Sequence, residues 1–195
     1  MAKPVRAIVG LGNPGPDYAQ TRHNAGALWL EHLARKKGQF LRPDKKLHGD
    51  YCKISIAGED IHLLFPSTFM NRSGQSVLSL SQFYKIELEN ILVAHDELDI
   101  DAGTLRLKFG GGHGGHNGLR DIIRCFGGNK DFPRMRLGIG HPGDKSKVTS
   151  HVLGRISKED MDKLESAFYQ LDTHLEAIIS GQWDTAMNRL HSFRA

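Results

Sequence analysis

Short apolar runs alternate with segments of helical periodicity along most of this chain. The runs at residues 5–9, 90–95 and 135–139 are typical of buried strands. Residues 24–37 and 74–86 carry apolar side chains at the three- and four-residue spacing of amphipathic helices. Such alternation is typical of an α/β fold, in which helices cover a central sheet.

The other segments fit the same class of fold. Residues 51–57 alternate apolar and polar side chains, and the Gly-Glu-Asp turn that follows predicts a hairpin with residues 61–65. Residues 161–178 predict one long amphipathic helix with Ser157 as its N-cap. We therefore expect a single domain over residues 1–195, an α/β sandwich whose mixed, largely parallel central sheet is flanked by helices.

Composition excludes several classes of protein. The chain has 195 residues, of which 39% are hydrophobic and 25% charged, as in an ordinary globular domain. No stretch approaches the roughly 20 apolar residues of a membrane helix, and the N-terminus lacks a signal sequence, so we expect a cytoplasmic protein. Cys52 and Cys125 are the only cysteines, which argues against a disulfide framework. The net charge of +4 permits a phosphate-rich partner without requiring one.

Residues 10–15 read Gly-Leu-Gly-Asn-Pro-Gly and match the spacing of the dinucleotide-binding fingerprint. That fingerprint needs a helix that opens at these glycines, whereas here a Pro-Gly-Pro sequence forces a turn and the helical pattern begins near Asn24. We interpret the segment as a tight turn that holds Asn13 at the carboxyl end of a strand. Residues 138–143 repeat the spacing and fail for the same reason.

Two further segments carry side chains suited to catalysis or to simpler roles. His23 precedes a helix, where histidine is either a surface or capping residue or, because of its near-neutral pKa, a general base. Asp96 follows a buried run, where it is either solvated or able to orient a histidine. Phe69, Met70 and Asn71 are either core and cap, or the apolar wall and amide donor of a pocket.

The glycine-rich segment 110–118 contains two histidines and ends beside a helical pattern. So many glycines favour unusual backbone angles or close approach of a ligand. Two histidines without a cysteine or third ligand argue against zinc, so we interpret the segment as a pocket rim with Asn117 as a hydrogen-bonding group. The chain has no GxSxG and no CxxC motif, so a hydrolase with this sequence would use water as its nucleophile.

Six segments together resemble the bacterial peptidyl-tRNA hydrolase family. They occur in the family's order and span nearly the whole chain, and their combination is far more specific than any one of them. The matching positions are residues 10–15, Tyr18 with residues 21–24 and Gly26, residues 69–74, residues 95–99, residues 110–120 and residues 136–143.

The resemblance implies an enzyme that hydrolyses the ester between tRNA and a peptide or N-blocked amino acid, recycling tRNA from stalled or aborted translation. His23 would activate water, Asp96 would support its basic form, and the amides of Asn71 and Asn117 would take part in catalysis. The substrate site would comprise Asn13, Tyr18, Phe69, Met70, Asn71, His116 and Asn117.

The resemblance also implies contacts between tRNA phosphates and Lys108 and Arg136, although Lys108 alone also fits the solvent side of an alternating strand. It implies no metal, no organic cofactor, no membrane and no obligate protein partner, and it implies a monomer. Two alternatives stay open: an RNA-binding protein of the same fold without catalysis, and a nucleotide-dependent enzyme that uses residues 10–15. The retained His23 and Asp96 favour the hydrolase. The peptide preference and the asparagine that faces the oxyanion stay open as well.

Overall fold

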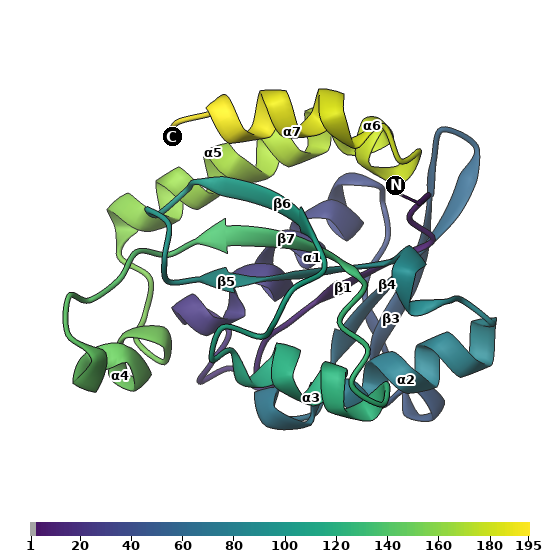
Figure 1. Cartoon of the computed structure of the whole chain (residues 1–195), viewed down its shortest axis with the longest axis horizontal. Helices are drawn as coiled ribbons and strands as arrows, with labels where there is room; N and C mark the ends of the chain where they lie inside the picture. Colours follow the sequence, from purple (N-terminus) through teal and green to yellow (C-terminus); the bar gives the residue numbers. More distant parts are fainter. Residues whose placement is uncertain (1–2) are drawn as a thin grey trace.

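The computed structural model describes residues 3–195 and shows a seven-stranded sheet between two layers of helices (Figure 1). The sheet has the order β2-β3-β4-β1-β5-β7-β6. Its four central strands are parallel and the pairs at both edges are antiparallel, which confirms the expected mixed sheet. The strands are β1 (Ala7–Gly10), β2 (Arg42–Asp44), β3 (Gly49–Ile56), β4 (Glu59–Pro66), β5 (Ile91–Glu97), β6 (Leu105–Phe109) and β7 (Pro133–Gly138).

The helices divide between the two faces of the sheet. α1 and the C-terminal helices α5–α7 pack on one face, and α2 and α3 pack on the other (Figure 1). In the described part of the chain, no helix is both long and apolar enough to cross a bilayer. The helices are α1 (Ala25–Lys36), α2 (Ser73–Tyr84), α3 (Asn117–Cys125), α4 (Val148–Val152), α5 (Lys158–Thr173), α6 (Leu175–Ile179) and α7 (Trp183–Ser192).

The central strands are buried on both faces, which explains why their sequences are continuously apolar. Along β1, Ile8 faces the core beneath α1 and the C-terminal helices, while Ala7 and Val9 face the core beneath α2 and α3. The expected hairpin is confirmed, because β3 and β4 pair antiparallel from Gly49↔Pro66 to Ile56↔Glu59.

The long C-terminal helix predicted over residues 161–178 is wrong in its continuity. α5 ends at Thr173 and α6 begins at Leu175, with His174 between them outside helical geometry. The apolar spacing runs through this break because both helices bury side chains in the same core, so periodicity alone could not locate it. Ser157 is the N-cap, as predicted, and its hydroxyl accepts a hydrogen bond from the Asp160 N–H at 3.1 Å.

Candidate active site

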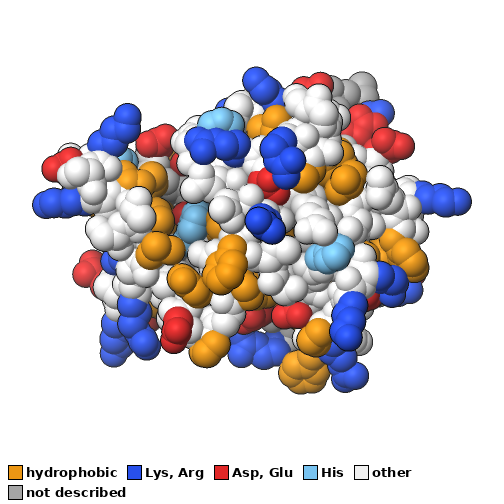
Figure 2. All heavy atoms as spheres, turned by 90° about the horizontal axis from the view of Figure 1, so that it is seen from below, with side chains coloured by type: hydrophobic (Ala, Val, Ile, Leu, Met, Phe, Trp, Pro, Cys, Tyr) orange, Lys and Arg blue, Asp and Glu red, His pale blue; other side chains and the backbone are white. Residues whose placement is uncertain are grey.

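A cleft of about 870 Å³ opens near the carboxyl ends of the central strands. Figure 2 shows the molecule from below the view of Figure 1, a face on which hydrophobic side chains are exposed among Lys and Arg side chains. Tyr18 does not line the cleft, but its ring lies edge-on to Phe69 at 6.3 Å. The cleft contains ten of the predicted site residues: Asn13, His23, Phe69, Met70, Asn71, Asp96, Lys108, His116, Asn117 and Arg136.

Close packing of α1 on the sheet brings His23 to the cleft. A Cβ on Gly26 would lie 2.2 Å from the Ala94 carbonyl oxygen, so only glycine lets the start of α1 approach β5 this closely. His23 lies in the short 3₁₀ helix Arg22–Asn24 directly before α1, and Asp96 lies near the end of β5. Both side chains are buried, although 73 residues separate them in sequence.

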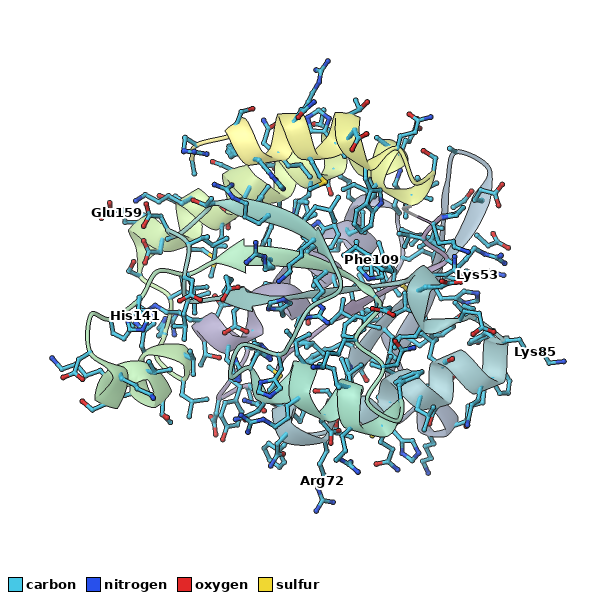
Figure 3. The ribbon with its side chains drawn as sticks, in the orientation of Figure 1. Lys53, Arg72, Lys85, Phe109, His141 and Glu159 are labelled. Atoms are coloured by element: carbon cyan, nitrogen blue, oxygen red, sulfur yellow. The ribbon has the colours of Figure 1, made fainter. Side chains whose placement is uncertain are left out.

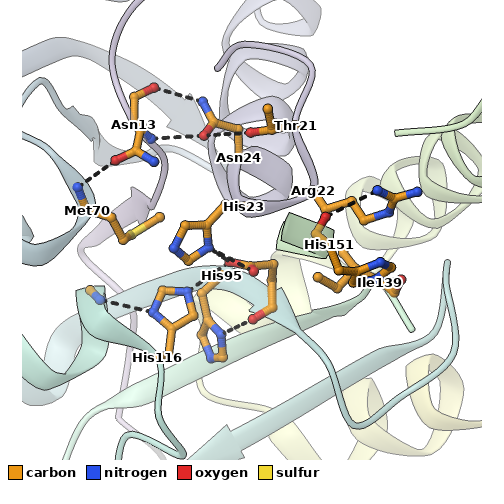
Figure 4. A network of polar contacts seen from close by, with 12 residues as sticks. Asn13, Thr21, Arg22, His23, Asn24, Met70, His95, His116, Ile139 and His151 are labelled. Carbon is orange, nitrogen blue, oxygen red and sulfur yellow. Dashed lines mark hydrogen bonds and ion pairs between the residues drawn. The ribbon is translucent and has the colours of Figure 1, made fainter. Parts of the chain in front are cut away.

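The Asp96 carboxylate holds one nitrogen of His23. Nδ1 of His23 lies 3.0 Å from Oδ1 and 2.9 Å from Oδ2 (Figure 4), so this nitrogen carries the proton that it donates to the carboxylate. The other ring nitrogen, Nε2, then has a free lone pair. An imidazole in this tautomer can accept a proton from water.

His116 donates a second hydrogen bond to the same carboxylate. As the N-cap of α3, it accepts the backbone N–H groups of Gly118 and Leu119 at Nδ1, at 3.1 and 3.3 Å. Its proton therefore lies on Nε2, which donates to Asp96 Oδ1 at 2.8 Å (Figure 4). From the sequence we expected His116 only to line the substrate site, so its hydrogen bond to Asp96 is a new finding.

Burial and charge shift the pKa values of His23 and Asp96 in opposite directions. Burial alone would lower the pKa of His23, but the charge of Asp96 and its hydrogen bond outweigh burial and raise that pKa above the ordinary histidine value. Burial would raise the pKa of Asp96, but His23 and His116 together hold it well below its usual range. The carboxylate is therefore ionised at neutral pH.

A third histidine lies beneath the pair and was missed in the sequence. His95 is buried in β5 and donates from Nδ1 to the backbone carbonyl of Asp96 at 2.8 Å. Burial and then the neighbouring His116 lower its pKa to about 3, so its imidazole is neutral. It packs against the His116 ring at 5.0 Å. In the sequence, His95 ends the apolar run 90–95, and nothing in that pattern indicated this contact.

Asn13 presents an amide donor to the cleft. Its Oδ1 accepts the Met70 backbone N–H at 2.7 Å, which fixes the orientation of the side-chain amide. The Asn24 side chain holds the Asn13 backbone at both N–H and C=O, each at 2.9 Å (Figure 4). Within residues 3–195, the Asn13 Nδ2 group makes no hydrogen bond. It is therefore available to a carbonyl oxygen of a ligand.

The other predicted polar residues lie at the rim of the cleft. Asn71 and Asn117 are exposed, and Asn117 begins α3, where its Oδ1 accepts from Arg120 at 3.1 Å. Lys108 is exposed at the end of β6, whereas Arg136 is half-buried in β7 and donates to Glu97 at 3.2 Å. This position of Lys108 is compatible both with a phosphate contact in the cleft and with a simple place on the solvent side of an alternating strand.

His23, Asp96 and His116 form a group whose ligand atoms lie within 4.8 Å of one another, the separation that a metal ion would need. The hydrogen bonds favour a different interpretation. Both histidine nitrogens that face Asp96 carry protons, so neither offers a lone pair to a metal there. The group is better suited to orienting a base than to binding an ion.

The site combines an imidazole oriented by a buried carboxylate with free amide donors. These groups are suited to a hydrolase that activates water. The turn at residues 10–15 is followed by no helix until Arg22, so the pyrophosphate site of a dinucleotide enzyme is not formed there.

Comparison with known proteins identifies the kind of hydrolase. The family model described as peptidyl-tRNA hydrolase matches residues 7–195. The chain is 59% identical to a peptidyl-tRNA hydrolase of Marinobacter nauticus over 194 residues, which cover 100% of this chain and 98% of the relative. It is 57% identical to that of Azotobacter vinelandii, with 98% of each chain covered.

A solved structure agrees with these sequence matches. The crystal structure of peptidyl-tRNA hydrolase from Acinetobacter baumannii has a TM-score of 0.94 and 48% identity, and covers 100% of this chain and 98% of that one. The chain therefore belongs to the peptidyl-tRNA hydrolase family. It is a carboxylic ester hydrolase that acts on peptidyl-tRNA.

Proposed function

We propose that His23 is the general base that activates water for attack on the ester carbonyl of peptidyl-tRNA. The observation that carries this role is the pair of contacts between Nδ1 and the Asp96 carboxylate, which leaves Nε2 free. Water gives its proton to Nε2 as its oxygen bonds to the carbonyl carbon. The same proton then passes to the departing ribose oxygen as the ester bond breaks, so His23 returns to its neutral form.

Asp96 would act through His23 and not on the substrate. Its charge stabilises the imidazolium that forms during attack, and its position fixes the tautomer. His116, proposed from the sequence as a substrate-site residue, would also keep the carboxylate in place through its own hydrogen bond. An ester needs no stronger nucleophile, because a ribose hydroxyl is a better leaving group than an amine.

The asparagine amides would recognise the acyl part of the substrate. The free Nδ2 of Asn13 fits the carbonyl oxygen of a peptide bond or an N-acyl group, which free aminoacyl-tRNA lacks. Asn71 and Asn117 lie at the rim as candidates to donate to the developing oxyanion. Loss of one such donor typically costs about 3–4 kcal/mol in the transition state.

The remaining predicted residues would bind other parts of the substrate. Phe69, Met70 and, through Phe69, Tyr18 supply apolar surface beside the asparagines. Lys108 and Arg136 would contact phosphates near the acceptor end of the tRNA, with energies that fall as salt rises. We further propose a single-domain monomer that acts without cofactor or obligate protein partner in the cytoplasm, where translation forms its substrate.

The first experiment measures release of N-acetyl-amino acid from N-acetyl-aminoacyl-tRNA by the wild type and by His23→Ala. The wild type should hydrolyse this substrate but spare unblocked aminoacyl-tRNA, and the variant should lose most turnover while it still binds tRNA. His48→Asn, which changes an exposed histidine outside the cleft, is the matched control. Wild-type turnover by His23→Ala would overturn the proposed base.

A further inference from the structure

Arg134 is a buried arginine for which the mechanism above gives no role. It lies in β7, and only 2% of its surface is exposed. Among residues 3–195, no carboxylate forms an ion pair with it. Burial and then the charge of Arg136 lower its pKa to about 10, so the guanidinium still carries its charge at neutral pH. A buried charge without an acid needs other partners.

Those partners are backbone carbonyls, two of them in the glycine-rich loop at residues 110–115 and one at Lys130. Nη1 of Arg134 donates to the Gly112 oxygen at 2.6 Å, and Nη2 donates to the Gly111 oxygen at 2.6 Å and to the Lys130 oxygen at 3.0 Å. The ring of Phe132 lies under the guanidinium, 4.1 Å from its Cζ. The planar guanidinium thus holds two successive loop carbonyls at once.

Most of the loop's other hydrogen bonds are local. The Gly110 N–H donates to the Phe132 carbonyl at 3.0 Å, and the contacts of His113 with the Gly115 and His116 N–H groups stay within this segment. Gly111, Gly114 and Gly115 have positive φ angles of 102°, 57° and 85°, which favour glycine and make the segment costly in entropy to order. A Cβ added at Gly112, Gly114 or Gly115 would meet nothing within 4 Å, so this part of the loop is not packed against the core.

The loop leads directly to His116, which donates to Asp96, and to Asn117 at the start of α3. We infer that Arg134 is a positioning residue that fixes the glycine-rich loop and thereby sets the places of His116 and Asn117. This inference rests on the proposed roles of Asp96, His116 and Asn117. Arg134 would therefore affect the rate of the chemical step and not the affinity for tRNA.

The competing interpretation is a direct contact between Arg134 and a tRNA phosphate, because Arg134 also lines the cleft beside Lys108 and Arg136. The geometry favours the positioning role. Both Nη groups already donate to carbonyls, and the remaining Nε is buried without a partner in the described residues. Nη1 keeps one further N–H, but only 2% of the Arg134 surface is exposed, so a phosphate has little access to the guanidinium.

The test compares Arg134→Lys with the wild type on N-acetyl-aminoacyl-tRNA at several salt concentrations. Lysine keeps the charge, but one ammonium group cannot replace the paired Nη contacts. We expect kcat to fall about ten-fold or more, with KM within about three-fold of wild type. The salt dependence of KM should stay unchanged. Arg106→Lys is the matched control, since Arg106 lies on neighbouring β6 outside the cleft lining.

Chemical rescue separates positioning from a general loss of structure. In Arg134→Ala, millimolar guanidinium should restore part of the lost kcat by occupying the vacated space between the two carbonyls. If that variant does not fold, Phe132→Leu replaces it. This change removes the ring beneath the guanidinium but keeps the charge, and we expect a smaller fall in kcat in the same direction.

Two results would overturn the inference. An unchanged kcat in Arg134→Lys or in Phe132→Leu would remove Arg134 from the chemical step. In Arg134→Ala, which removes the charge, a raised KM with a salt slope smaller by about one would show a phosphate contact instead. If His23→Ala has lost turnover, either result would refute the role of Arg134 and leave the proposed mechanism intact. Full turnover by His23→Ala would sink the proposed mechanism on which it rests.

Discussion

Asp96→Asn is the most direct test of whether the Asp96 charge supports His23, because the substitution removes one charge and changes almost no volume. The wild-type carboxylate accepts from His23 Nδ1 and from His116 Nε2. The asparagine has one oxygen to accept these two donors, and its NH₂ group would face one of the rings as a donor. If NH₂ faces His23, it favours the tautomer with hydrogen on Nε2, which cannot accept a proton from water.

The size of the effect follows from the contact distances. Asp96 Oδ1 and Oδ2 lie 3.0 and 2.9 Å from His23 Nδ1, and both residues are buried. Unit charges about 4 Å apart attract by about 4 kcal/mol at an effective dielectric constant of about 20. Loss of this attraction to the imidazolium alone would slow the reaction about 1000-fold. The wrong tautomer adds to the loss, and the corresponding change in a Ser-His-Asp triad lowers kcat by about 10⁴.

The assay is the pH dependence of kcat/KM for N-acetyl-aminoacyl-tRNA. As the proposed base, His23 would act in its neutral form, so activity should fall as pH drops through its pKa. Because Asp96 raises that pKa, the acid limb of the wild type should lie above the ordinary histidine value of about 6.5. In Asp96→Asn, burial no longer has an opposing charge, and the limb should move to lower pH.

The control is Asp101→Asn, an exposed carboxylate outside the cleft lining. A kcat for Asp96→Asn within about ten-fold of wild type, together with an unmoved acid limb, would refute the argument that the Asp96 charge supports His23.

Three further outcomes are expected. Lys108→Ala should weaken substrate binding and reduce its salt dependence, while Lys53→Ala, on the distant strand β3 (Figure 3), should not; equal salt slopes would remove Lys108 from the tRNA surface. EDTA should leave turnover unchanged, because the nitrogens facing Asp96 carry protons; inhibition reversed by one added metal would contradict this. Ser157→Ala should lower the free energy of unfolding by about 1 kcal/mol through loss of the α5 cap, and an unchanged denaturation midpoint would contradict it.

The sequence predicted the central strands well because they are buried on both faces and therefore continuously apolar. It did not predict β2, whose Arg-Pro-Asp sequence has no apolar pattern and which forms an edge strand by pairing with β3. It also did not predict α4, a five-residue helix without a buried residue. Both elements form through contacts with other parts of the chain, which a local sequence pattern does not show.

The residues of the candidate site also include some that the sequence predicted and some that it did not. His23, Asp96 and the asparagines were predicted from the resemblance, because each lies in a distinctive segment. The contact of His116 with Asp96 could not be predicted, since histidine is an uncommon N-cap and the segment appeared to be a flexible rim. Arg134 was missed because its partners are backbone carbonyls of glycines, which leave no complementary side chain in the sequence.

The two histidines that share Asp96 differ in which ring nitrogens are engaged, and this difference favours His23 as the proposed base. Both ring nitrogens of His116 are engaged, one as acceptor from α3 and one as donor to Asp96. Among the described residues, the His23 ring makes hydrogen bonds only through Nδ1, which leaves Nε2 free. The close approach of Gly26 to β5 places that turn, and the N-terminus of α3 occupies the competing imidazole. In the proposed mechanism, backbone packing therefore favours His23 over His116 as the base before any substrate binds.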